Sequence, residues 1–167
     1  MRVEITKRPD GCGVLRCTRD DGSVTWQKQT ARNAPHFALH DLTHFAVESA
    51  LGFGCGFFGL IAQGWEIDDT TGKGPRGPVP AEAAEVEALV GTFDSERAAS
   101  EIWPAADFNQ MAALHASNNS RLAPRQLTED DLARVRALRS ELFTRWSALP
   151  AGSSLKLTFD NSSRLFV

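Results

Sequence analysis

The chain has 167 residues, 42% of them hydrophobic and 23% charged, and a formal net charge of −3. These values are ordinary for a folded soluble protein, and the length suits one hydrophobic core, so we expect a single domain over residues 1–167. Because 21 acidic residues outnumber 18 basic ones, the chain lacks a global positive field. We therefore do not expect nucleic acid as a partner.

The cysteines and the longest apolar run indicate the cellular compartment. Three cysteines and no CxxC pair are atypical of a disulfide framework or a cysteine zinc site. The first residues lack the apolar core of a signal peptide, and the run LGFGCGFFGLIA is too short and too rich in glycine to span a bilayer. We expect a soluble, cytoplasmic protein with no membrane partner. A homo-oligomer is compatible with the sequence, which indicates no other specific partner.

The first 29 residues predict a β-meander. Three runs of alternating side chains, RVEITK, VLRCTR and VTWQKQ, are separated by the turn sequences RPDGCG and DDGS, whose Gly, Asp and Pro residues favour tight corners. Near the other end, SSLKLTFD places Leu155, Leu157 and Phe159 on one side of a further strand. We expect a small antiparallel sheet that the C-terminal strand completes.

Several helices are expected between these strands. PAEAAEVEALVG begins with proline and ends at Gly91, and ADFNQMAALHASNNS forms another helix that fades into a polar loop. Residues 68–79, DDTTGKGPRGPV, form a loop by composition. The predicted fold class is α+β, a small antiparallel sheet packed against several helices.

The clearest helix signal lies in LTEDDLARVRALRSELFTRWSAL, residues 127–149. Thr128 is expected as its N-cap, with Asp131 in the capping-box position. An apolar stripe follows at intervals of three and four, which we expect to lie on the sheet: Leu132, Val135, Leu138, Leu142 and Trp146.

The most informative segment is APHFALHDLTHFAVESALG, residues 34–52, in which His36, His40, His44 and Glu48 follow one another every four residues. On a helix these four positions spread over about 120° and about 18 Å. Because a zinc ligand bond is about 2 Å long, at most two adjacent members can share one ion. Pro35 suits only a first helical turn and disfavours helical geometry before it, which predicts an extended lead-in around His36.

The surroundings of the histidines decide what they can do. Leu39, Leu42, Ala46 and Ala50 form one apolar stripe, but Val47 and Leu51 lie on the histidine side. The helix is therefore apolar on two faces, and its histidines face a second layer or a cavity. A buried imidazole or carboxylate must be paired.

Three hypotheses satisfy that requirement. In the first, His40 and His44 bind zinc or iron, Glu48 or His115 completes the metal ligands, and Asp41 and Glu48 are the catalytic acid–base candidates of a metal-dependent hydrolase. In the second, a structural network such as a His44–Glu48 pair holds a non-catalytic interaction or regulatory module together. In the third, the same groups perform acid–base chemistry without a metal. Whether the chain is an enzyme stays open at this point.

Some of these stretches resemble known proteins. HDLTHF, residues 40–45, the following VE and the later GFFGLIAQGW are similar to segments of a group of small uncharacterised bacterial proteins with a leading β-meander. That resemblance covers roughly the first 65 residues and implies no activity.

The motif HDxxH, formed by His40, Asp41 and His44, is similar to three other motifs. It resembles the zinc motif of the ubiquinone-biosynthesis scaffold family, which has a glutamate where this chain has Gly56, so Glu48 would have to substitute. It resembles the HExxH motif of zinc proteases, but its shorter acid reaches a metal-bound water less well, which disfavours a protease. It also resembles the His-Asp pair of HD-type phosphohydrolases, which are all-helical, whereas the upstream chain here is predicted as β.

GCGFFG, residues 54–59, satisfies the dinucleotide-binding pattern GxGxxG. That fingerprint requires a strand before it and a helix after it, whereas this one follows the histidine helix. We interpret the glycines as a close-packed bend between two helical pieces, with Phe53, Phe57 and Phe58 filling the core.

Overall fold

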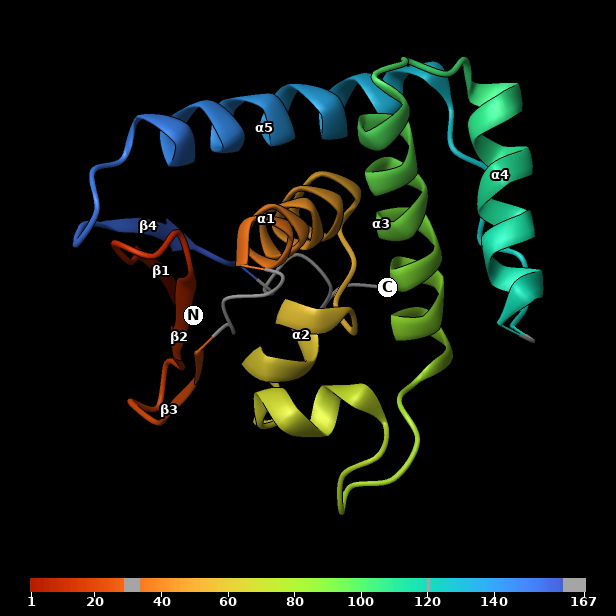
Figure 1. Ribbon diagram of the computed structural model, residues 1–167. Helices are drawn as coiled ribbons and strands as arrows, with labels where there is room; N and C mark the ends of the chain where they lie inside the picture. Colours follow the sequence, from red (N-terminus) through yellow and green to blue (C-terminus); the bar gives the residue numbers. More distant parts are fainter. Residues whose placement is uncertain (29–33, 120, 161–167) are drawn as a thin grey trace.

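The computed structural model describes residues 1–28, 34–119 and 121–160. Its class is α+β, as predicted (Figure 1). The strands are β1 (Arg2–Lys7), β2 (Gly13–Thr18), β3 (Val24–Lys28) and β4 (Ser154–Thr158). The helices are α1 (Ala34–Leu51), α2 (Phe57–Ala62), the 3-10 helix η2 (Ile67–Thr71), α3 (Ala81–Ala99), α4 (Ala105–Asn118) and α5 (Glu129–Ala148).

The four strands form one antiparallel sheet in the order β3-β2-β1-β4. Ile5 lies opposite Leu15 on one side and Leu155 on the other. Because side chains alternate along a strand, this register gathers the apolar residues on one buried face. The predicted meander and its C-terminal strand are thus confirmed, except that residue 29, the last of the predicted meander, lies outside the described residues.

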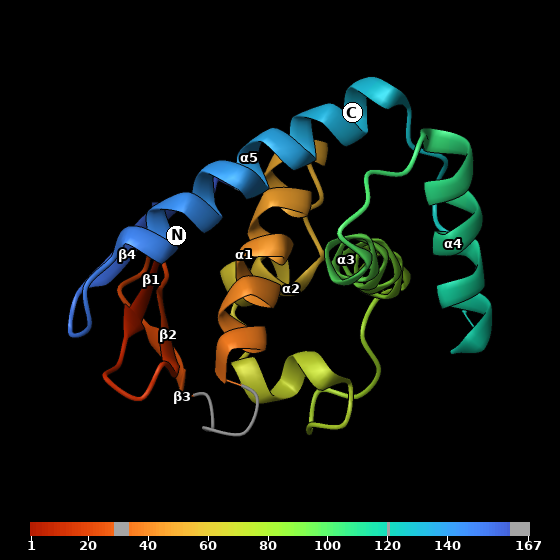
Figure 2. The same cartoon turned by 45° about the horizontal axis from the view of Figure 1, so that its top comes forward.

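Helix α1 occupies the centre of the molecule. It lies between the sheet and α3, while α5 runs across it and α4 covers the outer side of α3 (Figures 1 and 2). Every residue from 41 to 48 is buried, as expected for a helix that is apolar on two faces. One hydrophobic cluster joins the sheet to α1, α3 and α5.

Helix α5 begins as predicted. The Thr128 hydroxyl accepts from the Asp131 backbone N–H, and the Asp131 carboxylate accepts in return from the Thr128 backbone N–H, which is a complete capping box. The apolar stripe is buried at Leu132, Val135, Leu142 and Trp146. Its main neighbour is α1 rather than the sheet, because α1 already covers the buried face of the short strands.

Two predicted boundaries differ from the structure. Helix α1 begins at Ala34, so His36 belongs to its first turn and not to an extended lead-in. Helix α3 continues past Gly91 to Ala99. A β-carbon at Gly91 would lie 3.2 Å from the His115 ring, so the glycine here permits close packing of α3 on α4 and does not end the helix.

The remaining connections follow the predictions more closely. The prediction of a loop over 68–79 is wrong for residues 68–71, which form most of η2, and holds for the rest, which has no regular element. Helix α4 lies within the predicted segment, whose last residue, 120, is outside the described part. The glycine-rich stretch after α1 is the expected bend, in which Phe53 and Phe58 are buried. Among the described helices, none has the length and apolar character needed to cross a membrane.

Replacing Thr128 with Ala should destabilise the protein by about 1 kcal/mol, because the first turn of α5 loses its side-chain acceptor. Thr144→Ala, at an exposed position near the C-terminal end of the same helix, should change stability by less than about 0.5 kcal/mol. Urea unfolding of both variants measures the difference. Equal stability of the two would show that the capping box does not anchor α5.

Candidate metal centre

The candidate site lies where α1 crosses α3 at a steep angle (Figure 2). His40 Nδ1 lies 2.8 Å from Asp94 Oδ2, and His44 Nε2 lies 3.4 Å from Glu87 Oε1. The two histidines are one turn apart on α1, whereas the two carboxylates are two turns apart on α3. Each histidine therefore faces its own acid on the neighbouring helix.

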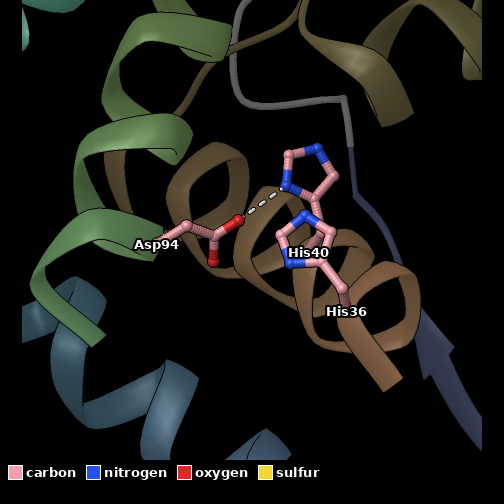
Figure 3. A group of neighbouring side chains, drawn as sticks. All are labelled: His36, His40 and Asp94. Atoms are coloured by element: carbon pink, nitrogen blue, oxygen red, sulfur yellow. Dashed lines mark hydrogen bonds and ion pairs between the residues drawn. The ribbon is translucent and has the colours of Figure 1, made fainter. Parts of the chain in front are cut away.

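The imidazoles follow one another along α1. The ring centroids of His36 and His40 are 5.5 Å apart in a stacked arrangement, and those of His40 and His44 are 4.8 Å apart, edge to face. Figure 3 shows Asp94 reaching from α3 toward His40, with His36 beside the same ring. The spacing of four in the sequence thus produces a continuous row of rings.

Among the described residues, two groups of side chains have the proximity needed to hold a metal ion. One consists of His36, His40 and Asp94, and the other of His40, His44 and Glu87; within each, the potential ligand atoms lie within 4.8 Å of one another. His40 belongs to both groups. As expected from helix geometry, no single group contains all the histidines of α1.

The geometry favours the second group. In the first, His40 Nδ1 is already hydrogen-bonded to Asp94 Oδ2 at 2.8 Å, and His36 is exposed. The other oxygen of Asp94, Oδ1, makes no hydrogen bond within the described residues. In the second, the 3.4 Å between His44 and Glu87 exceeds an ordinary hydrogen bond. It matches the separation of about 3.3 Å between two ligands of a tetrahedral zinc with bonds of about 2 Å.

Carboxylates also orient both histidines of this second group. His44 Nδ1 lies 3.3 Å from Glu48 Oε1, and His40 Nδ1 lies against Asp94. With each Nδ1 paired to an acid, Nε2 is the nitrogen left for a metal. Such carboxylate–histidine pairs fix the ring and its tautomer in metal sites.

Glu48 lies outside both groups, although the sequence marked it as a ligand and a catalytic residue. Its fully buried carboxylate accepts from the backbone N–H of Phe58 at 3.2 Å and of Gly59 at 2.9 Å. A β-carbon at Gly56 would lie only 2.5 Å from this carboxyl group. The first turn of α2 therefore covers Glu48, whose carboxylate holds the Nδ1 side of the His44 ring.

His115 also lies outside both groups. Its Nε2 is 3.2 Å from Ser95 Oγ, between α3 and α4. It reaches the candidate site only across a cavity of about 290 Å³ that His40, Glu87 and His115 all line.

Asp41 remains close to the candidate ligands. It lines a second cavity, of about 220 Å³, together with His40, His44 and Glu87. It is also largely buried. The structure thus brings four of the relevant side chains to one cavity, three of which the sequence had singled out.

The charges at the site shift two pKa values in opposite directions. Burial alone would lower the pKa of His44, but the hydrogen bond that His44 donates to Glu48 and the charges of Glu87, Glu48 and Asp41 outweigh it and raise that pKa. Burial would raise the pKa of Asp94, but its hydrogen bond with His40 and the nearby positive charges lower it. The site is therefore a place where positive charge is favoured.

Glu87 and Asp94 were not predicted as site residues. They are seven positions apart, so they share a face of α3 with Gly91 between them. Because the predicted helix ended at Gly91, Asp94 lay outside it, and Glu87 was one of several acids in AEAAEVE. The spacing of seven is the signal that could have identified them, since it places Glu87 and Asp94 on one face of a helix that continues past Gly91.

Comparison with protein-family models, with curated protein sequences and with solved structures found no match. The resemblances seen in the sequence therefore stay predictions.

Glu48→Gln should destabilise the protein by about 1 to 3 kcal/mol. The amide supplies one acceptor where the carboxylate satisfies two backbone donors and a histidine, so one buried partner is left unsatisfied. The control Glu141→Gln, on the exposed side of α5, should have almost no effect. Urea unfolding of the metal-free protein measures both, and a Glu48 variant as stable as the control would contradict the supporting role.

Proposed function

We propose that this protein binds a divalent metal ion, zinc or ferrous iron, through His40, His44 and Glu87. The observation that carries the proposal is the 3.4 Å separation of His44 Nε2 from Glu87 Oε1, beside a histidine whose own Nδ1 is paired with an acid. An ion between these atoms would replace one weak contact by two ligand bonds.

The ligand types limit which metal ions the site would bind. Two imidazole nitrogens and one carboxylate oxygen suit catalytic zinc and non-haem ferrous iron, whereas calcium and magnesium prefer oxygen ligands throughout. Three protein ligands leave at least one coordination position for water or substrate. The cavity of about 220 Å³ beside the three side chains provides room for it.

Hydrolysis is the reaction that this arrangement would serve. A metal ion lowers the pKa of a bound water and polarises a carbonyl or phosphoryl oxygen. Asp41 lines the same cavity and would accept the proton of the attacking water. Phe57 and Ile67 make another part of the wall apolar, which would favour a small substrate with an apolar portion.

The alternative is a non-catalytic interaction or regulatory module with a structural histidine helix. The observation in its favour is the Glu48 network, which joins His44 to the first turn of α2 by contacts within the protein. In that case His44→Ala would lower the melting temperature, and added zinc would change it neither in the variant nor in the wild type.

The test is calorimetric titration of chelator-treated protein with zinc and, under anaerobic conditions, with ferrous iron. We expect about one ion per chain, together with a rise in melting temperature on metal addition. Glu87→Gln should weaken binding by at least about 10-fold, since a direct ligand matters at least as much as its supporting residues. Glu87 is 45% exposed, so this variant should fold.

Glu85→Gln is the matched control on the same helix. Glu85 pairs with Arg125, away from the histidines, and the variant should bind metal like the wild type. Failure of the wild type to bind either ion would overturn the proposal. Equal binding by both glutamate variants would remove Glu87 from the site.

A further inference from the structure

A larger cavity lies away from the candidate metal centre. It has a volume of about 810 Å³ and lies between the C-terminal end of α3, residues 101–102 and one face of α5. It shares no lining residue with the cavities that adjoin His40 and Glu87. Its volume is within the range of small-molecule sites.

The cavity is elongated, because α5 lines it over several turns. Arg136, Ser140, Phe143 and Ser147 recur at intervals of three and four along its wall. From Arg136 to Ser147 the helix rises by about 16 Å. A ligand that fills the groove along α5 is therefore elongated.

One part of the groove offers uncovered apolar surface. The Ile102 side chain is 79% exposed and Phe143 is half-buried; both line the cavity, with Ala148 beyond them. Covering such surface is favourable in proportion to the apolar area removed from water. An apolar chain is the chemistry that matches it.

The other part is polar but mostly satisfied. The buried carboxylate of Glu96 accepts from Arg136 and from the Trp103 backbone N–H, and Arg139 lies 3.6 Å away. Arg139 also donates to the Phe93 carbonyl oxygen. These groups form a closed network that builds the floor of the groove.

Among the arginines that line the groove, Arg97 has the weakest contacts within the described residues. Its buried Nε makes no hydrogen bond within the described residues, and its ion pair with Asp94 is long, at 3.6 Å. Asp94 is itself engaged by His40 at 2.8 Å. The side chain is 32% exposed and lines the groove, where a carboxylate would give it a charge-assisted partner.

We propose that this groove binds an elongated amphiphilic monocarboxylate. Its carboxylate pairs with the Arg97 guanidinium, and its apolar chain lies along Ile102 and Phe143. A single negative charge is specified because three arginines and two glutamates line the groove, which leaves one positive charge for a ligand to balance. This inference does not depend on the metal centre.

The experiment is calorimetric titration of the full chain with decanoate, below its micelle concentration, and with 1-decanol as the uncharged analogue. We expect saturable binding of decanoate, with weaker binding of decanol. Arg97→Gln should weaken decanoate binding by about 10-fold or more, because a charged partner is lost, and should leave decanol binding unchanged. Ile102→Ser should weaken both.

Arg134→Gln is the control, since Arg134 pairs with Asp131 at the start of α5 and does not line the groove. It should bind decanoate like the wild type. Absence of decanoate binding by the wild type, or equal binding by Arg97→Gln, would overturn the proposal. So would a dimer in sedimentation that Ile102→Ser dissociates, because a second copy would then cover the groove.

Discussion

The buried carboxylate of Glu48 is the interaction on which the arrangement of the site depends. It accepts two backbone N–H groups of the first turn of α2 and contacts His44 on its own helix. A charge this far from water must be fully partnered. The contact therefore fixes the rotation of α1 about its axis, and with it the direction in which His40 and His44 point.

The orientation of α1 determines which side chains of α3 its histidines meet. The row of imidazoles faces α3, where Glu87 and Asp94 lie on one side of the helix. Gly91, between them, allows α4 to approach closely, since any side chain there would meet the His115 ring. The same stretch of α3 thus serves two surfaces, one toward the histidines and one toward α4.

Local patterns predicted the fold well because its elements carry their own signals. Alternation and turn residues define the strands, and the Thr128–Asp131 capping box defines the start of α5. The end of α3 was missed, since the tolerance of Gly91 inside a helix depends on a contact with His115, 24 positions further along the chain. The predicted packing partner of α5 was also wrong, because sequence periodicity shows that a helix face is buried but does not show which element covers it.

The candidate site was predictable only on the side of α1. Helix geometry selected neighbouring pairs of histidines, and His40 and His44 are such a pair in the structure. The third candidate ligand, Glu87, depends on where α3 packs against α1. No spacing within residues 34–52 indicates that position. Glu48 looked like a ligand because it has the right spacing, but spacing alone cannot show that α2 folds back and takes up its oxygens.

The electrostatics of the site explain why the acid that supports His44 and the acid proposed as a metal ligand are different residues. Glu48 is committed to backbone donors and cannot move without breaking them, whereas Glu87 is partly exposed and can shift toward an ion. The charges of Glu48, Glu87 and Asp41 together raise the pKa of His44. The field that holds a proton there also attracts a metal cation, so the two compete for one imidazole. A metal bound by His44 must displace that proton, and its affinity must therefore fall as the pH is lowered.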